Sequence, residues 1–120
     1  MIRGVVEDKQ QITELNNILI YNYMISTELE TAINSSKLIV SRSGYTTIMD
    51  LAKLGKKAIF VPTPGQFEQL YLSKKLSKQK VVPSIKQEKF TYSDLKWNNT
   101  YSGFDEMDSK IIYKELFSLF

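Results

Sequence analysis

The amino-acid sequence predicts an α/β fold in which helices flank a parallel sheet. Short apolar runs of strand length recur through the first two-thirds of the chain, and segments with helical spacing separate them. Glycine and proline residues mark where these segments end. Since single helices between successive strands imply right-handed parallel crossovers, we expect these strands to pair in parallel.

Four apolar runs are predicted to be strands. The first is expected to be buried, because its apolar residues follow one another without alternation. Pro62 and Pro64 stop the third, since proline cannot donate a hydrogen bond to a sheet. In chain order the four are residues 17–23, residues 37–41, residues 57–61 and a short strand that begins at Val81, and residues 2–6 are a candidate for an additional edge strand.

Three helices are predicted along the same part of the chain. A serine or threonine cap precedes the first, and a glycine suited to the left-handed conformation ends the second. They run from Ser26 or Thr27 to residues 34–36, over residues 46–54 ending at Gly55, and over residues 66–79 with Phe67, Leu70 and Tyr71 on one face. A closing helix near the C-terminus is expected from the spacing of Ile111, Ile112, Leu116, Phe117 and Phe120.

Length and composition exclude several classes of protein. A chain of 120 residues with 42% hydrophobic residues is expected to form one globular domain, residues 1–120. It contains neither cysteine nor histidine, so disulfides, thiolate chemistry and the commonest general base are excluded. No apolar run approaches the ~20 residues of a membrane span, and no signal peptide is evident, so we expect a cytoplasmic protein. The net charge of +3 is mild, and no nucleic-acid partner is expected from it.

The dipeptide Ser43-Gly44 lies between a predicted strand and a predicted helix. Backbone N–H groups at such a helix start, together with the helix dipole, form a site suited to a phosphate. Gly44 allows the backbone to approach a ligand closely, and the hydroxyls of Ser43, Thr46 and Thr47 supply further donors. Serine and threonine at a helix start are more often ordinary caps, and the local pattern alone favours capping.

Asp50 shares a helix face with Thr46 and Lys53 at 100° per residue. The opposite face is apolar and consists of Ile48, Leu51 and Ala52. The carboxylate is therefore expected one turn beyond the phosphate site, where it can accept hydrogen bonds from both ribose hydroxyls, as acidic residues do in dinucleotide-binding folds. The alternative is a solvated aspartate paired with a nearby lysine, and the local pattern favours neither.

A rigid loop, Pro62-Thr63-Pro64-Gly65, follows the next strand, and Gln66, Glu68 and Gln69 lie at the start of the helix after it. Amide side chains both donate and accept hydrogen bonds, which suits the paired hydroxyls of a sugar. A rigid turn followed by a polar helix start is the simpler interpretation, and it is favoured when this loop is considered alone.

Together these segments resemble the donor-binding half of the GT-B glycosyltransferases of family 28, in the branch that contains the bacterial N-acetylglucosaminyltransferase of lipid II synthesis. The resemblance covers about residues 17–76 and depends on the order and spacing of three stretches. They are Ser41-Arg42-Ser43-Gly44-Tyr45-Thr46-Thr47-Ile48-Met49-Asp50, Leu54-Gly55-Lys56-Lys57-Ala58-Ile59-Phe60-Val61-Pro62, and Gln69. The resemblance implies a Rossmann-like parallel sheet flanked by helices, the C-terminal half of a GT-B fold.

The resemblance also implies roles for single residues. Asp50 would hold the uridine ribose, in a place where the family more often has glutamate, and the turn Ser43-Gly44-Tyr45 would face the diphosphate. Gln69 fills the first place of a glutamine pair that contacts the donor sugar and phosphate, whereas Leu70 stands at the second place. The expected substrate-binding residues are Ser43, Gly44, Tyr45, Thr46, Asp50, Gly65, Gln66 and Gln69.

The implied activity is inverting transfer of a sugar from a UDP-sugar, such as UDP-N-acetylglucosamine or a similar hexose donor, to an acceptor hydroxyl. This chemistry requires no cofactor and no metal. GT-B enzymes have a second, N-terminal half that binds the acceptor and usually supplies the general base. We therefore expect this chain to be a fragment of a longer enzyme, or the donor subunit of a two-component transferase, and to be inactive by itself.

Other functions stay open at this point. They are a nucleotide-sugar epimerase-related domain, a non-catalytic module that binds a nucleotide sugar, and an α/β interaction module that binds no nucleotide. A cluster of lysines adds a question about location, because it could contact an anionic membrane at its inner face. A solvated helix face is the favoured interpretation of this cluster, which consists of Lys74, Lys75, Lys78 and Lys80.

Overall fold

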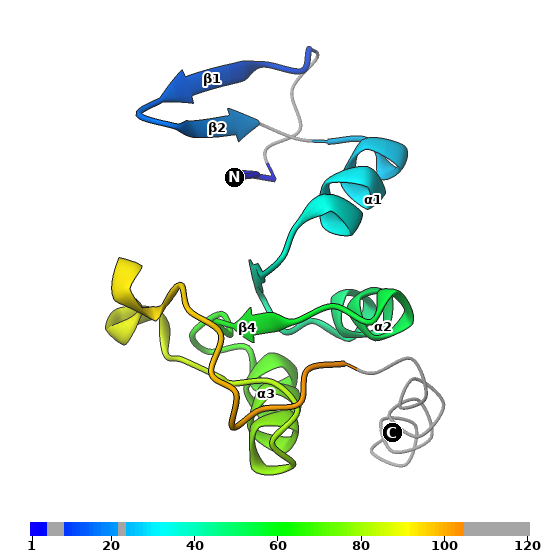
Figure 1. Ribbon diagram of the computed structural model, residues 1–120. Coiled ribbons are helices and arrows are strands. Elements are labelled where there is room, and N and C mark those ends of the chain that lie inside the picture. The colour runs from blue at the N-terminus through cyan, green and yellow to red at the C-terminus, as the bar shows by residue number, and fades with distance from the viewer. Residues whose placement is uncertain (5–8, 22–23, 105–120) are drawn as a thin grey trace. The chain divides into compact units, whose positions relative to one another are not determined.

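A computed structural model describes residues 1–4, 9–21 and 24–104 of the chain (Figure 1). The chain divides into two compact units, Met1–Ser35 and a second unit that begins at Ser36, and each is described by itself. The closing helix predicted over residues 111–120 lies outside the described residues. Within the part of the chain that the structure describes, no helix has the length and apolar character needed to cross a bilayer.

The first unit contains an antiparallel hairpin that the sequence analysis did not predict. Strands β1 (Ile12–Leu15) and β2 (Ile18–Tyr21) pair through a two-residue turn at Asn16-Asn17, where φ is 46° and 68°. Asparagine tolerates this left-handed conformation, and two such residues in sequence give the turn that suits the twist of a hairpin. The prediction of a buried, parallel strand over residues 17–23 was therefore wrong in its pairing and burial, since β2 is antiparallel and none of its residues is fully buried.

Two other predictions for this unit fare better. Helix α1 (Ser26–Ser35) has the predicted start and end. The predicted edge strand over residues 2–6 is represented by a parallel bridge between Ile2 and Tyr21, in which the Arg3 N–H donates to the Tyr21 carbonyl over 2.9 Å. Residues 5–8 lie outside the described residues, so the length of this strand is not defined.

The second unit contains the predicted parallel strand–helix–strand arrangement. Strand β3 (Ile39–Ser41) pairs in parallel with β4 (Ala58–Phe60), with Ile39 opposite Ala58 and Ser41 opposite Phe60. Helix α2 (Tyr45–Leu54) connects the two strands. On the other side of β4, Phe60 forms a parallel bridge with Ser84, so β4 is central. The final strand, predicted to begin at Val81, is represented by this isolated bridge at Ser84, and the Val82 side chain is buried in the core.

Helix α2 ends as its glycine predicts. Gly55 is left-handed, with φ of 63° and ψ of 38°. Its N–H donates to the Ala52 carbonyl over 3.2 Å, and the Lys56 N–H donates to the Leu51 carbonyl over 3.1 Å. These two bonds form a Schellman motif, which satisfies carbonyl groups at the helix end.

Helix α3 (Phe67–Lys78) matches the predicted range. Its buried residues are Leu72, Ser73 and Leu76. Phe67, Leu70 and Tyr71 do share a face, but it is the exposed one, and their side chains are 80%, 42% and 45% exposed. Positions 72 and 76 are one turn apart on the opposite side of the helix, and that side meets the sheet.

Buried side chains from α2, β4 and α3 contribute to the core of this unit, and the helices lie beside β4 in Figure 1. The Phe104 ring lies 6.2 Å from the Phe60 ring. Two single-turn 3₁₀ helices, η1 (Gln87–Lys89) and η2 (Tyr92–Asp94), follow the last bridge. The buried apolar residues are Ile48, Leu51, Ala52, Ala58, Ile59, Phe60, Val61, Leu72, Leu76, Val82 and Phe104.

Candidate functional site

The predicted site residues lie on two segments that follow neighbouring parallel strands. The chain leaves β3 through residues 42–44 and enters α2, and it leaves β4 through residues 61–66 and enters α3. The Val61 N–H donates to the Ser41 carbonyl over 2.9 Å, so the two strand ends are directly paired. The carboxyl ends of parallel strands are the usual place for a ligand in open α/β sheets.

Ser43 connects the two segments. Its side chain is fully buried, and its hydroxyl donates to the backbone carbonyl of Gln69 over 2.7 Å. This bond fixes the turn before α2 against the first turn of α3. A phosphate contact from the same hydroxyl proton would have to replace the bond to Gln69.

Gln69 holds the loop after β4 in place. Its side-chain Oε1 accepts a hydrogen bond from the Thr63 N–H over 2.8 Å. Because the backbone carbonyl of Gln69 accepts from Ser43 as well, this one residue joins both segments. The side-chain amide group has two N–H donors, and they project from a residue that is only partly buried.

Arg42 is a residue that sequence reasoning did not single out. Its Nη1 donates to the Val61 carbonyl over 3.0 Å and lies 3.4 Å from the Pro62 carbonyl. The guanidinium group thus ties the end of β3 to the end of β4. The sequence does place an arginine directly before the Ser-Gly turn. Its partners, however, are backbone carbonyls, which a pattern of side chains does not predict.

The N-terminus of α2 is open at Gly44. Gly44 is the N-cap, no side chain caps the helix, and the first helical bond runs from the Ile48 N–H to the Gly44 carbonyl over 3.0 Å. A Cβ placed on Gly44 would meet no atom within 4 Å. The side chains of Ser43, Thr46 and Thr47 therefore do not cap α2, which was the alternative interpretation of these residues. The positive end of the helix dipole lies at this turn, beside the space that is open next to Gly44.

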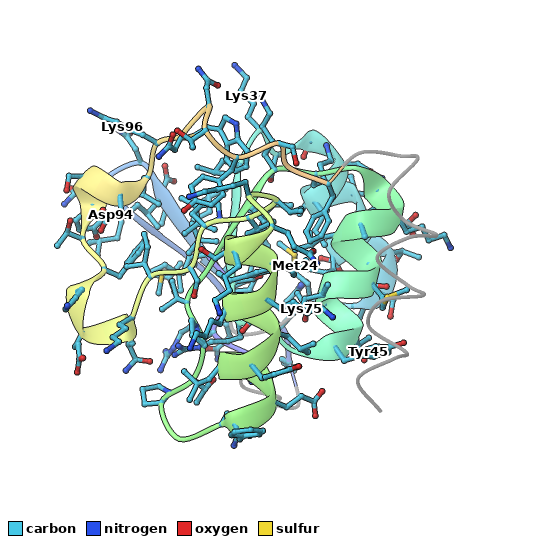
Figure 2. All side chains as sticks on the ribbon, turned by 90° about the horizontal axis from the view of Figure 1, so that it is seen from below. Met24, Lys37, Tyr45, Lys75, Asp94 and Lys96 are labelled. Carbon is cyan, nitrogen blue, oxygen red and sulfur yellow. The ribbon has the colours of Figure 1, made fainter. Side chains whose placement is uncertain are left out.

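Figure 2 shows α2 and α3 side by side, with Tyr45 labelled on the first turn of α2. Tyr45 and Thr47 are partly buried, whereas Thr46 is exposed. The Tyr45 ring and the hydroxyls of the two threonines thus lie next to the open helix start. These residues belong to the first turn of α2, where the sequence analysis placed an anion.

Asp50 lies on the exposed face of α2, as predicted. Thr46, Asp50 and Lys53 are exposed, and the opposite face is buried, with Ile48 at 0% and Leu51 at 1% exposure. Among the residues that the structure describes, Asp50 has no hydrogen bond or ion pair. The alternative of a lysine-paired aspartate is therefore not the arrangement observed, and the carboxylate is available to a ligand.

Gly65 shapes the second loop. It has φ of 81°, and the Gln66 N–H donates to the Thr63 carbonyl over 3.1 Å, which closes a type II turn with Pro64 at its second position. A Cβ on Gly65 would meet no neighbour, so the turn conformation rather than crowding favours glycine here. Gln66 follows as the exposed N-cap of α3, and Glu68 is exposed beside it. Within the described residues, no three acidic side chains gather closely enough to hold a metal ion.

Comparison with known proteins identifies the family. Residues 3–101 match the model of the glycosyltransferase family 28 C-terminal domain. The chain belongs to this family. The resemblance drawn from the Ser-Gly turn, Asp50 and Gln69 is confirmed at this level, and so is the fold class, the α/β C-terminal half of a GT-B fold. No solved structure matches the chain.

Individual relatives of this family 28 domain match shorter stretches. A UDP-N-acetylglucosamine–N-acetylmuramyl-(pentapeptide) pyrophosphoryl-undecaprenol N-acetylglucosamine transferase of Rhodopseudomonas palustris is 46% identical over 43 residues, which is 36% of this chain and 12% of the relative. The enzyme of the same name from another strain of that species is 35% identical over 66 residues, 52% of this chain and 18% of the relative. The Bradyrhizobium diazoefficiens enzyme is 44% identical over 43 residues, 36% of this chain and 12% of the relative. The chain thus aligns with less than a fifth of each relative.

Proposed function

We propose that this chain is the donor-binding domain of an inverting glycosyltransferase and that it binds a UDP-sugar, with UDP-N-acetylglucosamine as the first candidate. The observation that carries the proposal is the combination of an open helix start at Gly44 with an exposed Asp50 on the same helix, which has no partner among the residues that the structure describes. The family supports sugar transfer, and the names of the relatives supply the candidate donor.

The two features suit opposite ends of a nucleoside diphosphate. The start of α2 offers backbone N–H groups and a positive dipole to the diphosphate. Six residues further on, about 9 Å along the helix axis, the Asp50 carboxylate can accept from the two ribose hydroxyls. Gln66 and the amide group of Gln69 lie on the neighbouring segment, where they can reach the sugar.

The proposed reaction is a single displacement. The acceptor hydroxyl attacks the anomeric carbon, and the bond from that carbon to the diphosphate oxygen breaks. The leaving diphosphate gains negative charge, and the start of α2 is placed to stabilise it. We propose that a second half of the enzyme, or a partner subunit, binds the acceptor and removes its proton, so that these 120 residues alone turn over poorly.

The location follows from the same proposal. A donor such as UDP-N-acetylglucosamine and an acceptor on a lipid carrier, as the relatives' names describe, would bring the enzyme to the cytoplasmic face of a membrane. No resident cofactor takes part in the proposed step, because the diphosphate leaves with the bonding electron pair and the proton goes to the acceptor's base.

Calorimetric titration of the full chain with UDP, ADP and GDP tests the proposal. We expect UDP to bind more tightly than the other two. Equal binding of all three diphosphates would contradict recognition of the uridine nucleotide. A folded sample that binds none of them would contradict the site itself and favour an interaction module.

Gly44→Ser is expected to separate folding from binding. Serine is a better N-cap than glycine, and Gly44 has φ of −70° and ψ of 151°, which serine adopts readily. We expect the unfolding midpoint to stay the same or rise slightly, while UDP affinity falls several-fold because the added side chain occupies the space in front of the helix start. Thermal unfolding and UDP titration of the same sample measure both effects. Unchanged affinity would show that the diphosphate does not approach Gly44.

A further inference from the structure

The loop after β4 begins where the pairing of β3 with β4 ends. The last pair in the register joins Ser41 to Phe60, and the Val61 N–H still donates to the Ser41 carbonyl over 2.9 Å. Pro62 follows, and proline has no N–H to offer to a neighbouring strand. The sheet therefore stops at this proline, and the loop beyond it needs other contacts to keep one conformation.

Arg42 supplies such contacts from the end of β3. Its Nη1 donates to the Val61 carbonyl over 3.0 Å and lies 3.4 Å from the Pro62 carbonyl. Val61 and Pro62 are both buried, and buried carbonyl groups need hydrogen-bond partners. A guanidinium N–H forms a stronger bond to such a carbonyl than a neutral donor does. One nitrogen of Arg42 thus holds two successive residues at the start of the loop.

The rest of the loop is held from α3. The Thr63 N–H donates to Oε1 of Gln69 over 2.8 Å, and the Gln66 N–H donates to the Thr63 carbonyl over 3.1 Å. Gln66 is the exposed N-cap of α3. The position of its side chain therefore depends on contacts at both ends of the loop, and Arg42 makes those at the strand end.

The start of α2 has supports that do not involve the Arg42 side chain. The Ser43 hydroxyl donates to the Gln69 carbonyl over 2.7 Å, and the Ile48 N–H donates to the Gly44 carbonyl over 3.0 Å. Ile48 is fully buried beneath this turn of the helix. Loss of the Arg42 contacts should therefore disturb the loop after β4 more than the helix start at Gly44.

We propose that Arg42 is a positioning residue for the sugar part of the donor. It fixes the loop after β4, and with it Gln66, at the place from which the amide group reaches the sugar, while the diphosphate and the ribose are bound by α2. This inference rests on the proposed function, because it assumes that a UDP-sugar occupies the site. Arg42 acts through the loop, and recognition of the sugar is the property that it controls.

The experiment is calorimetric titration of the full chain with UDP and with UDP-N-acetylglucosamine. Arg42→Gln removes the charge, and glutamine is too short to reach the two carbonyls. We expect the affinity for UDP-N-acetylglucosamine to fall roughly ten-fold and that for UDP to change by less than about two-fold. Arg42 is exposed, so the variant leaves no cavity in the core, and thermal unfolding of the same sample checks that it is folded.

Two further variants separate the hydrogen bonds from the charge. Arg42→Lys keeps the charge but replaces the planar group by an ammonium that suits one carbonyl, so it should lose UDP-N-acetylglucosamine affinity only about three-fold. It also carries the test if Arg42→Gln does not fold. Lys89→Gln removes one positive charge from an exposed position in η1 and should leave the affinity for both ligands unchanged.

The pair of ligands distinguishes a failure of this inference from a failure of the proposed function. A folded wild-type chain that binds neither ligand would contradict the proposed function, and this inference with it. If the wild-type chain binds both, equal losses for UDP and UDP-N-acetylglucosamine in Arg42→Gln would assign Arg42 to the diphosphate or to the fold in general. Unchanged affinity for both ligands in this variant would show that Arg42 has no part in donor binding. A wild-type chain that binds UDP alone would place sugar recognition outside this loop and also overturn the inference.

Discussion

Asp50→Ala is expected to weaken UDP binding roughly 5- to 150-fold, which corresponds to the ~1–3 kcal/mol lost with hydrogen bonds to a charged group. The carboxylate is exposed and has no partner among the described residues, so its removal breaks no internal contact there. The unfolding midpoint should therefore change little. Titration of the wild-type chain and the variant with UDP measures the effect directly.

Two further variants show whether the loss belongs to Asp50 in particular. Asp50→Asn keeps the size of the side chain but removes its charge, and it should lose part of the affinity. Glu88→Gln removes one exposed negative charge in η1 and should leave UDP binding unchanged. If Asp50→Ala bound UDP as tightly as the wild-type chain, the proposed ribose contact would be wrong, whatever the helix start contributes.

Phe60→Ala is expected to give the largest loss of stability, about 3–5 kcal/mol. Phe60 is 0% exposed in the core of the second unit, with its ring 6.2 Å from the Phe104 ring, so the smaller side chain leaves a cavity. Folded domains have only about 5–15 kcal/mol of stability in total. Urea unfolding followed by the fluorescence of the single tryptophan, Trp97, reports on this unit, because Trp97 lies within it.

Phe67→Ala is the matched control for this substitution. It makes the same chemical change at a side chain that is 80% exposed, and we expect a change within about 0.5 kcal/mol. Comparable losses of stability in the two variants would contradict the observed core. They would indicate that Phe67 is buried, as residues on an apolar helix face ordinarily are.

The central strand–helix–strand unit could be predicted from sequence because its signals are local. Gly55 ends α2 through its own left-handed conformation. The alternation of buried and exposed residues along α2 follows from helical geometry, and it places Asp50 outside and Ile48 inside without knowledge of any other segment. The turn at Asn16-Asn17 had a local signal too, but the apolar run after it was interpreted by its composition and not by the turn that precedes it.

The contacts that hold the candidate site together could not be predicted in this way. Ser43 and Gln69 are 26 positions apart in the chain, and Arg42 and Val61 are 19 apart. Their hydrogen bonds exist only once β3 and β4 are paired in register. The partners are mostly backbone carbonyls, which every residue possesses, so no residue type marks them.

The sequence by itself determined the β3–α2–β4 arrangement, the exposed position of Asp50 and the glycine at the helix start, since each depends on neighbours along the chain. Tertiary structure decided which face of α3 is buried. It also brought the Ser43 hydroxyl into a hydrogen bond with the Gln69 backbone carbonyl. Both depend on where the sheet edge lies relative to the helix, because burial and long-range hydrogen bonds are properties of packed segments and not of the segments alone.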